Sequence, residues 1–383
     1  MKKICVLLII ILVATTQASC WSRREIEDLG FVMGLGVCRT DAGLYTITVQ
    51  FANPSAIVAE NPDQRYIYTI MEGHGLSIFD ALRNLSMVAG RRLFLSHVNV
   101  IIIEESLAKE GIKDFLGFLL QDMEVRLEQE VFISKIPPKE ILDTPNTLGV
   151  IPAMALHSMA LNQGANSKIY VADLHEALEA VHSPVNNFVT SLVEIIPAPT
   201  ENEMDFLNLT EIAIFEHDRL IGYLHHEDGQ SYNFITNNFE NGVIVFERSE
   251  KEDIITIEVL QSTTDIVPKY SNGKVGFDIS LDVNGNIAGR TIQTELREPV
   301  IIEDVNNQFA KVLLDKLNKS IITAQQDFGV DYYNLSGHFA RKYPKEFANM
   351  KDDWNKHFAE ADITVTVKTE IVHSALGTLG GDE

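Results

Sequence analysis

The sequence is poor in cysteine. Its 383 residues include three cysteines, Cys5, Cys20 and Cys38. Cys5 lies in an apolar leader that we expect to be removed, and Cys20 lies directly after that leader. Cys38 is then the remaining thiol of the folded body, which excludes an intrachain disulfide framework. Because Cys38 follows Val37 in an apolar run, we expect a small buried side chain rather than a reactive thiol.

Positive charge is also scarce. The chain carries 31 Lys and Arg against 54 Asp and Glu, a formal net charge of −23, and loss of Lys2 and Lys3 with the leader would give −25 (−23 − 2). So acidic a surface argues against a nucleic-acid partner, which requires a basic face. It also argues against electrostatic docking to anionic lipid, so we expect the body to stand away from the bilayer.

Long apolar runs are missing from the rest of the chain after residue 20. No run there approaches the roughly eighteen apolar residues of a membrane span. The leading apolar run, residues 4–14, would reach about 16 Å as a helix, against about 30 Å of hydrocarbon core. Lys2 and Lys3 precede this run, and small polar residues follow it at 15–19. The pattern predicts a secretory signal over residues 1–19.

The end of the leader, Ala18-Ser19-Cys20, resembles a bacterial lipobox, although Gln17 stands where such boxes prefer an aliphatic residue. In that motif the cysteine receives a diacylglycerol and becomes the new N-terminus, so we expect lipidation at Cys20. Two acyl chains, at about 0.8 kcal/mol per buried CH₂, anchor a protein stably. The alternative is ordinary cleavage nearby, which would leave a soluble secreted protein.

Apolar periodicity in the first half predicts strands at residues 31–37, 44–51, 66–72, 98–103, 130–136 and 189–196, and helices at 77–90 and 106–126. The second strand alternates and is predicted to be half-buried. Gly73 and Gly75 are expected to end the third strand, and Ser77 to cap the first helix. That helix is expected to turn Ile78, Leu82, Leu85 and Val88 inward. The strand at 98–103 is expected to be central and buried on both faces.

A composition shift at 197–203 predicts a domain boundary. We therefore divide the mature chain into an N-terminal α+β region of one or two subdomains at 20–197, a linker at 198–207, a C-terminal α+β domain at 208–376 and a tail at 377–383. The C-terminal part is predicted to contain strands at 211–215, 219–224, 242–247, 254–260, 274–283 and 363–371 and helices at 304–327 and 343–358. Mixed sheets flanked by helices place the chain in the α+β class.

Signatures of catalysis are weak. Gly34-Leu35-Gly36 begins like a dinucleotide fingerprint, but Arg39 stands at the third glycine position and a strand follows. The residues around Ser77 lack the second glycine of a nucleophile elbow, which favours a helix cap. We predict no catalytic residue, no cofactor and no metal site, and hence no enzyme.

Histidines and aromatic residues provide the remaining candidates. His225-His226-Glu227-Asp228 is the best metal-like cluster, but its position after a strand favours a solvated turn. His338 and His357 fall in separate helical stretches and are expected to be packing or surface residues. The pairs Tyr332-Tyr333 and Trp354 with Phe358 could line a pocket, although core or interdomain packing is the favoured interpretation.

Three blocks of the sequence resemble the Ger(x)C family of lipoproteins, the C subunits of bacterial spore germinant receptors. They are residues 20–26 with 29–36; residues 72–76 with 97–104 and 111–112; and residues 324–329 with Trp354, Phe358 and 365–367. Ser22 stands where the family usually has Asp, and Gln326 where it commonly has Lys. The blocks span nearly the whole mature chain in order.

The resemblance implies a three-domain α+β fold, attached through Cys20 to the outer leaflet of the inner spore membrane. It also implies a complex with a permease-like membrane subunit and a second multi-span subunit, which together respond to nutrients. In that complex this chain would be a required partner rather than a catalyst. The alternatives are a solute-binding lipoprotein that captures a nutrient itself and, last, an extracytoplasmic hydrolase.

Overall fold

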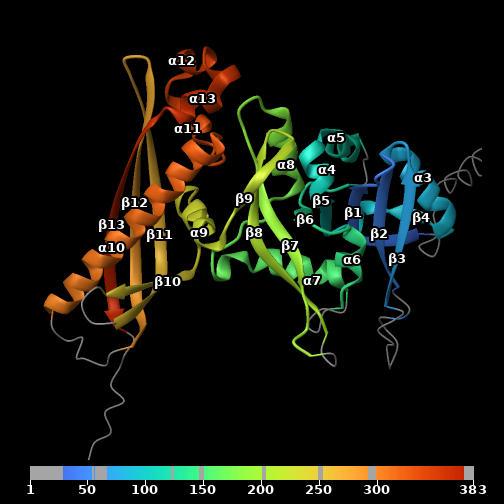
Figure 1. Ribbon diagram of the computed structural model, residues 1–383, viewed down its shortest axis with the longest axis horizontal. Helices are drawn as coiled ribbons and strands as arrows, with labels where there is room; N and C mark the ends of the chain where they lie inside the picture. Colours follow the sequence, from blue (N-terminus) through green and yellow to red (C-terminus); the bar gives the residue numbers. More distant parts are fainter. Residues whose placement is uncertain are drawn as a thin grey trace, which may run out of the picture.

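The computed structural model describes residues 29–53, 56, 67–121, 125–145, 151–200, 204–248, 253–291 and 299–374 of the chain. The signal at 1–19, the lipidation site Cys20 and the tail at 377–383 lie outside these residues. The described part forms two mixed β-sheets with helices packed on them (Figure 1), which confirms the α+β class. Within it no helix combines the length and apolar character needed to cross a bilayer.

The first sheet has nine strands in the order β3-β2-β1-β5-β6-β7-β8-β9, with β4 beside β1. The strands are β1 Leu29–Arg39, β2 Tyr45–Ala52, β3 Tyr68–Gly75, β4 Arg92–Phe94, β5 Val100–Glu104, β6 Glu130–Ser134, β7 Val189–Ile196, β8 Phe206–Glu216 and β9 Arg219–Leu224. Strands β1, β5, β6 and β7 are parallel, and the outer pairs are antiparallel. The predicted central strand, β5, is buried on both faces.

Helices cover both faces of this sheet. One face carries α3 Ile78–Ala89, α4 Glu105–Glu110, α5 Lys113–Gln121 and α8 Leu174–His182, and the other carries α6 Pro138–Asp143 and α7 Pro152–Leu161. Because α6 and α7 cover the second face, the polar side chains of β2 are buried too, so the half-buried prediction is wrong. Gln50 shows how they are accommodated: its amide donates to the Leu142 carbonyl (2.5 Å) and accepts from the Ala153 amide (3.1 Å).

The region around α3 confirms one prediction and corrects two. The Ser77 hydroxyl accepts from the Asp80 amide and caps the helix as expected. Strand β3, however, continues through Gly73 and Gly75, where α3 lies so close that a Cβ on Gly73 would stand 2.3 Å from a carbonyl oxygen of the helix. Val88 is exposed, although its three-residue spacing from Leu85 places it near the buried stripe; it lies in the last turn of α3, next to the Gly90 cap.

The predicted linker at 198–207 joins β7 to β8, which pair antiparallel. The first sheet therefore continues across this segment to Leu224, and the second sheet begins at Gly242. Helix α9, His226–Ile235, lies between the two sheets in sequence. The division into domains at 198–207, and the three domains implied by the resemblance, stay predictions.

The second sheet has the order β10-β11-β12-β13, formed by β10 Gly242–Arg248, β11 Asp253–Ser271, β12 Lys274–Arg290 and β13 Asp362–Ser374. Strands β11 and β12 form a long hairpin whose turn, Asn272-Gly273, has the positive φ angles (51° and 78°) expected for that dipeptide. Strand β13 returns to pair parallel with β12.

The amphipathic helix predicted at 304–327 is confirmed as α10 Pro299–Ile322 followed by a π-helical turn, η6 Thr323–Phe328. Its stripe is buried against the second sheet through Val305, Phe309, Leu313, Leu317, Ile321 and Ala324. Three short helices follow: α11 Leu335–Lys342, α12 Pro344–Ala348 and α13 Trp354–Ala359. Tyr332, Trp354 and Phe358 belong to this core, as the packing interpretation predicts.

Two buried groups complete the packing. Cys38 in β1 is buried, and burial, reinforced by the Glu104 charge, raises the pKa of its thiol to about 11, which suits a packing role. Asp331 is fully buried at the start of α11, where its carboxylate accepts from the Trp354 indole N–H (2.8 Å) and from two amides of the helix (3.0 and 2.8 Å). Burial raises the pKa of Asp331, and these three hydrogen bonds oppose that rise.

Candidate functional site

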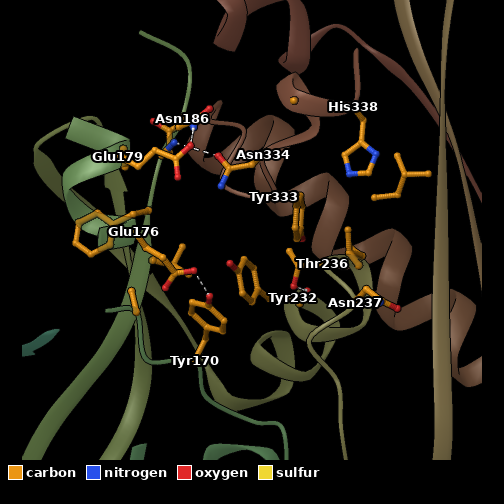
Figure 2. A pocket seen from close by; sticks show the side chains of 18 of the residues that line it. Tyr170, Glu176, Glu179, Asn186, Tyr232, Thr236, Asn237, Tyr333, Asn334 and His338 are labelled. Carbon is orange, nitrogen blue, oxygen red and sulfur yellow. Dashed lines mark hydrogen bonds between the residues drawn. The ribbon is translucent and has the colours of Figure 1, made fainter. Parts of the chain in front are cut away.

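A cavity of about 520 Å³ lies where the first sheet's helix layer meets the second sheet and its helices. Figure 2 shows side chains from both halves of the chain converging on it. Its lining comes from α8 and the loop after it, from α9, from β11 and from the start of α11. The polar lining residues include Tyr170, Glu176, Glu179, Asn186, Asn187, Tyr232, Thr236, Asn237, Thr264, Tyr333, Asn334, His338 and Arg341.

Glu176 is the carboxylate held deepest in the lining. It stands in the first turn of α8, where it forms a capping box with Asp173 that fixes the start of the helix. The Tyr170 phenol donates to its Oε1 at 2.5 Å. Burial raises the pKa of Glu176, and the Tyr170 hydrogen bond partly opposes the rise. Burial, with the neighbouring Tyr232 and Glu176, also raises the pKa of Tyr170, so the phenol keeps its proton.

Three tyrosines form the inner wall, with one edge-to-face and one stacked contact between them. Tyr232 of α9 lies with its ring centroid 5.4 Å from Tyr170 and 6.0 Å from Tyr333, so it joins the two halves of the lining. The Tyr333 hydroxyl hydrogen-bonds the hydroxyl of Ser320 in α10 (2.6 Å). The wall is therefore aromatic, and the phenol groups of Tyr170 and Tyr333 already have protein partners.

Asn187 ties the two halves together beside the cavity. Its side-chain amide donates to the Asp331 carbonyl (3.1 Å), its Oδ1 accepts from the His217 amide (3.2 Å), and its own backbone N–H donates to Asn334 Oδ1 (3.2 Å). Because Asn187 is buried, these contacts are shielded from water and fix the position of α11 against the first sheet. The neighbouring Asn186 makes a more exposed contact with Glu179 (3.3 Å).

The mouth of the cavity carries groups of both signs. Glu179, Asn334 and Arg341 are exposed there, and His338 is half-buried beside Arg341. Burial, and then the Arg341 charge, lower the pKa of His338, so its ring is neutral near pH 7. Aromatic walls, one buried carboxylate and a cation at the mouth suit a small polar molecule with charges of both signs.

The lining offers no paired nucleophile and base within the described residues. The Thr236 hydroxyl donates to the Tyr232 carbonyl (2.8 Å) and the Thr264 hydroxyl to the Phe234 carbonyl (2.5 Å), so both are engaged with backbone.

The histidines singled out in the sequence lie in separate parts of the structure. His225 precedes α9 and contacts Glu211 (2.7 Å), so the cluster 225–228 begins a helix rather than a solvated turn. No group of three or more His, Cys, Asp or Glu in the described part could hold a metal. His357 pairs with Asp353 (3.3 Å), whereas His338 lines the cavity.

The sequence analysis singled out Tyr333 and His338 but not the opposite wall, Tyr170, Glu176 and Tyr232. Those residues come from separate elements, and only the pairing of the two halves brings them together. The capping signal Asp173-x-x-Glu176 was visible in the sequence, but it indicates a helix start and says nothing of a cavity.

Comparison with known proteins connects both halves of the chain to spore germination. Residues 22–195 match the profile of the spore germination protein N-terminal domain, and residues 210–375 match the spore germination B3/GerAC-like C-terminal profile. Spore germination protein KC of Bacillus subtilis (strain 168) is 25% identical over 399 residues, covering 98% of this chain and 97% of that protein. Spore germination protein B3 of the same organism is 23% identical over 373 residues, covering 94% of this chain and 95% of that protein.

A solved structure shares the fold. The crystal structure of the GerBC protein aligns with a TM-score of 0.59 and 18% sequence identity, covering 91% of this chain and 100% of that one. The architecture of two mixed sheets with helices is therefore that of a known protein.

Proposed function

The chain belongs to the Ger(x)C family of spore germination proteins, and from that membership we propose that it is the lipid-anchored, non-catalytic subunit of a nutrient germinant receptor. The observation that carries the proposal is the extent of the likeness: two family profiles follow one another along almost the whole chain after the leader, and the curated relatives match end to end.

In this proposal the subunit acts by contact. It is held by a diacylglyceryl group on Cys20 at the outer leaflet of the inner spore membrane, where it assembles with a permease-like membrane subunit and a second multi-span subunit. The acidic body and the absence of a nucleophile–base pair in the described cavity lining are compatible with a binding role.

The anchor is tested with Cys20→Ala in spores. We expect the variant to be lost from the membrane fraction and nutrient-triggered germination to fall to the level of a strain that lacks the protein. Cys38→Ala is the matched control, because it removes the buried thiol of β1 and leaves the attachment site intact. Wild-type membrane attachment and germination of the Cys20→Ala strain would contradict the proposal.

The cavity favours a second candidate function, direct capture of a small nutrient. Its volume of about 520 Å³ is in the range of small-molecule sites, and its lining presents groups of both signs. Calorimetry of the mature lipoprotein with amino acids and sugars should then show ligand-dependent rises in melting temperature that Tyr232→Ala abolishes. A melting temperature that no candidate nutrient changes would rule this function out in favour of assembly alone.

A further inference from the structure

The outer face of α3 carries a group of exposed apolar side chains. Leu76, just before the helix, is 82% exposed, Phe79 55% and Met87 77%, and Leu76 and Met87 are the two most exposed large apolar side chains among the described residues. Single exposed apolar residues are ordinary on protein surfaces, but a contiguous set marks a contact surface.

The geometry of α3 explains why these residues have no cover. Ile78 and Leu85 face the sheet and are buried, so positions 79, 83 and 87, spaced four apart, share the opposite side of the helix. The Phe79 ring centroid lies 6.4 Å from that of Phe118 of α5, and a groove of about 850 Å³ lies between α3, the β4 segment that follows it and Phe118.

The same face is locally basic on an acidic protein. Residues 76–95 contain three arginines and one acid, Asp80, whereas the whole chain carries −23. Asp80 accepts from the Leu76 amide (3.0 Å) and from the Asn84 side chain (3.4 Å), so it serves the helix start. Arg83 lies over the Phe79 ring (4.9 Å) and Arg91 follows the helix, and both are exposed. Arginines beside apolar side chains are typical of surfaces that meet a lipid headgroup layer.

The position of this face near the N-terminus of the mature chain is compatible with contact to a lipid headgroup layer. Leu29, the first described residue of β1, pairs with Arg92 next to the end of α3. Cys20 precedes Leu29 by nine residues, a chain length that spans about 30 Å at most, while the twelve residues of α3 span about 18 Å. A lipid on Cys20 therefore keeps α3 within reach of the membrane. In Figure 1, α3 and β4 lie at one end of the molecule, and the second sheet lies at the other.

We propose that the outer face of α3, formed by Leu76, Phe79, Arg83, Met87 and Arg91, rests on an anionic membrane surface. The apolar side chains enter the headgroup region, and the two arginines pair with lipid phosphates. This inference rests on the anchor in the proposed function and adds an orientation to it. It also revises the expectation that the whole body stands away from the bilayer. The acidic remainder of the protein stays away from the membrane, whereas the end that contains α3 contacts it.

The test places a fluorescent reporter on the lipidated, full-length mature protein. Because Cys38 is buried, a thiol-reactive NBD label selects the introduced cysteine, either Met87→Cys on α3 or the control Val245→Cys on β10, where the valine is 52% exposed. The protein is bound to vesicles of 70% phosphatidylcholine and 30% phosphatidylglycerol that contain a headgroup-level nitroxide lipid. We expect at least two-fold quenching at residue 87 with a blue-shifted emission, and none at residue 245.

The outcomes separate the orientation from the anchor. A protein that fails to float with the vesicles would refute the anchor and the orientation together. A protein that floats but shows no more quenching at 87 than at 245 would refute the orientation alone. Quenching that appears only when the receptor's membrane subunits are present would also overturn it, because α3 would then face a protein.

A second variant tests the chemistry of the face. With the label at Met87→Cys, the exchange Phe79→Glu should abolish quenching while flotation and melting temperature are retained, because Phe79 is exposed and its loss leaves the core intact. Vesicles of phosphatidylcholine alone should quench less than the anionic mixture. Equal quenching in both would refute the role assigned to Arg83 and Arg91.

Discussion

Replacement of Asn187 by alanine should weaken the link between the two halves of the chain. The exchange leaves the His217 amide without its partner at 3.2 Å, and it leaves the Asp331 carbonyl with the longer hydrogen bond from the Asn334 amide (3.4 Å) after loss of the one at 3.1 Å. An unpaired buried group costs about 1–3 kcal/mol and a lost hydrogen bond about 1 kcal/mol, so the free energy of unfolding should fall by about 2–4 kcal/mol. For a unit of 150–250 residues this corresponds to a drop in melting temperature of roughly 5–15 °C.

The assay is differential scanning calorimetry of the mature protein. In addition to the lower melting temperature, we expect the transition of Asn187→Ala to broaden or split, because the segment that leads into α11 loses one of its two hydrogen bonds to residue 187. Asn186→Ala is the matched control: it removes one contact with the exposed Glu179 and should change the melting temperature by less than 2 °C. If the two variants melted within 2 °C of each other, the argument that Asn187 couples the halves would be refuted.

Three other predictions concern packing and charge. Gly73→Ala should lower the free energy of unfolding by about 1–3 kcal/mol in urea titrations, because its Cβ would overlap the backbone of α3, whereas Gly117→Ala, with open space around its Cβ, should raise stability slightly. The pKa of Glu176 is raised in the folded state, so as the pH falls the folded protein binds a proton there before the unfolded chain does, and it gains stability. Glu176→Gln removes this group, so the rise in melting temperature from pH 7 to pH 5 should be smaller in the variant than in the wild type. Phe309→Ala should lower the free energy of unfolding by about 3–5 kcal/mol in the same titration, because Phe309 is fully buried. Ile322→Ala, at an exposed position of the same helix, should leave that free energy almost unchanged.

Local signals in the sequence predicted much of the fold. The cap at Ser77, the turn at Asn272-Gly273 and the stripe of α10 each depend on neighbouring residues, and the structure confirms all three. The family resemblance, which rests on short blocks spread along the chain, is confirmed as well.

The errors arise where a distant element changes the environment of a segment. The alternation in β2 predicted one solvated face, but α6 and α7, about a hundred residues later, bury Thr48 and Gln50. Asn284-Gly285 has the composition of a turn, yet β12 continues through it because strands pair on both sides. A Cβ on Gly285 would meet Ile257 at 2.6 Å, so the glycine permits close packing.

The cavity was beyond sequence reasoning for the same reason. Tyr170 and Tyr333 carry no mark of their own that connects them, and their common neighbour, Tyr232, lies in a third element. Only the assembled structure shows that one carboxylate, several amides and a tyrosine wall surround a shared space.

The parallel pairing of β13 with β12 has a consequence for biogenesis. A polypeptide synthesised from its N-terminus delivers β10, β11 and β12 first, and then α10 to α13, before the last strand of the sheet arrives. During that interval the seventeen-residue edge of β12 lacks its neighbour and is open to association with other unfinished chains. Rapid docking of α10 over the unfinished sheet would shield its apolar face, so the order of emergence itself limits aggregation while the final strand is awaited.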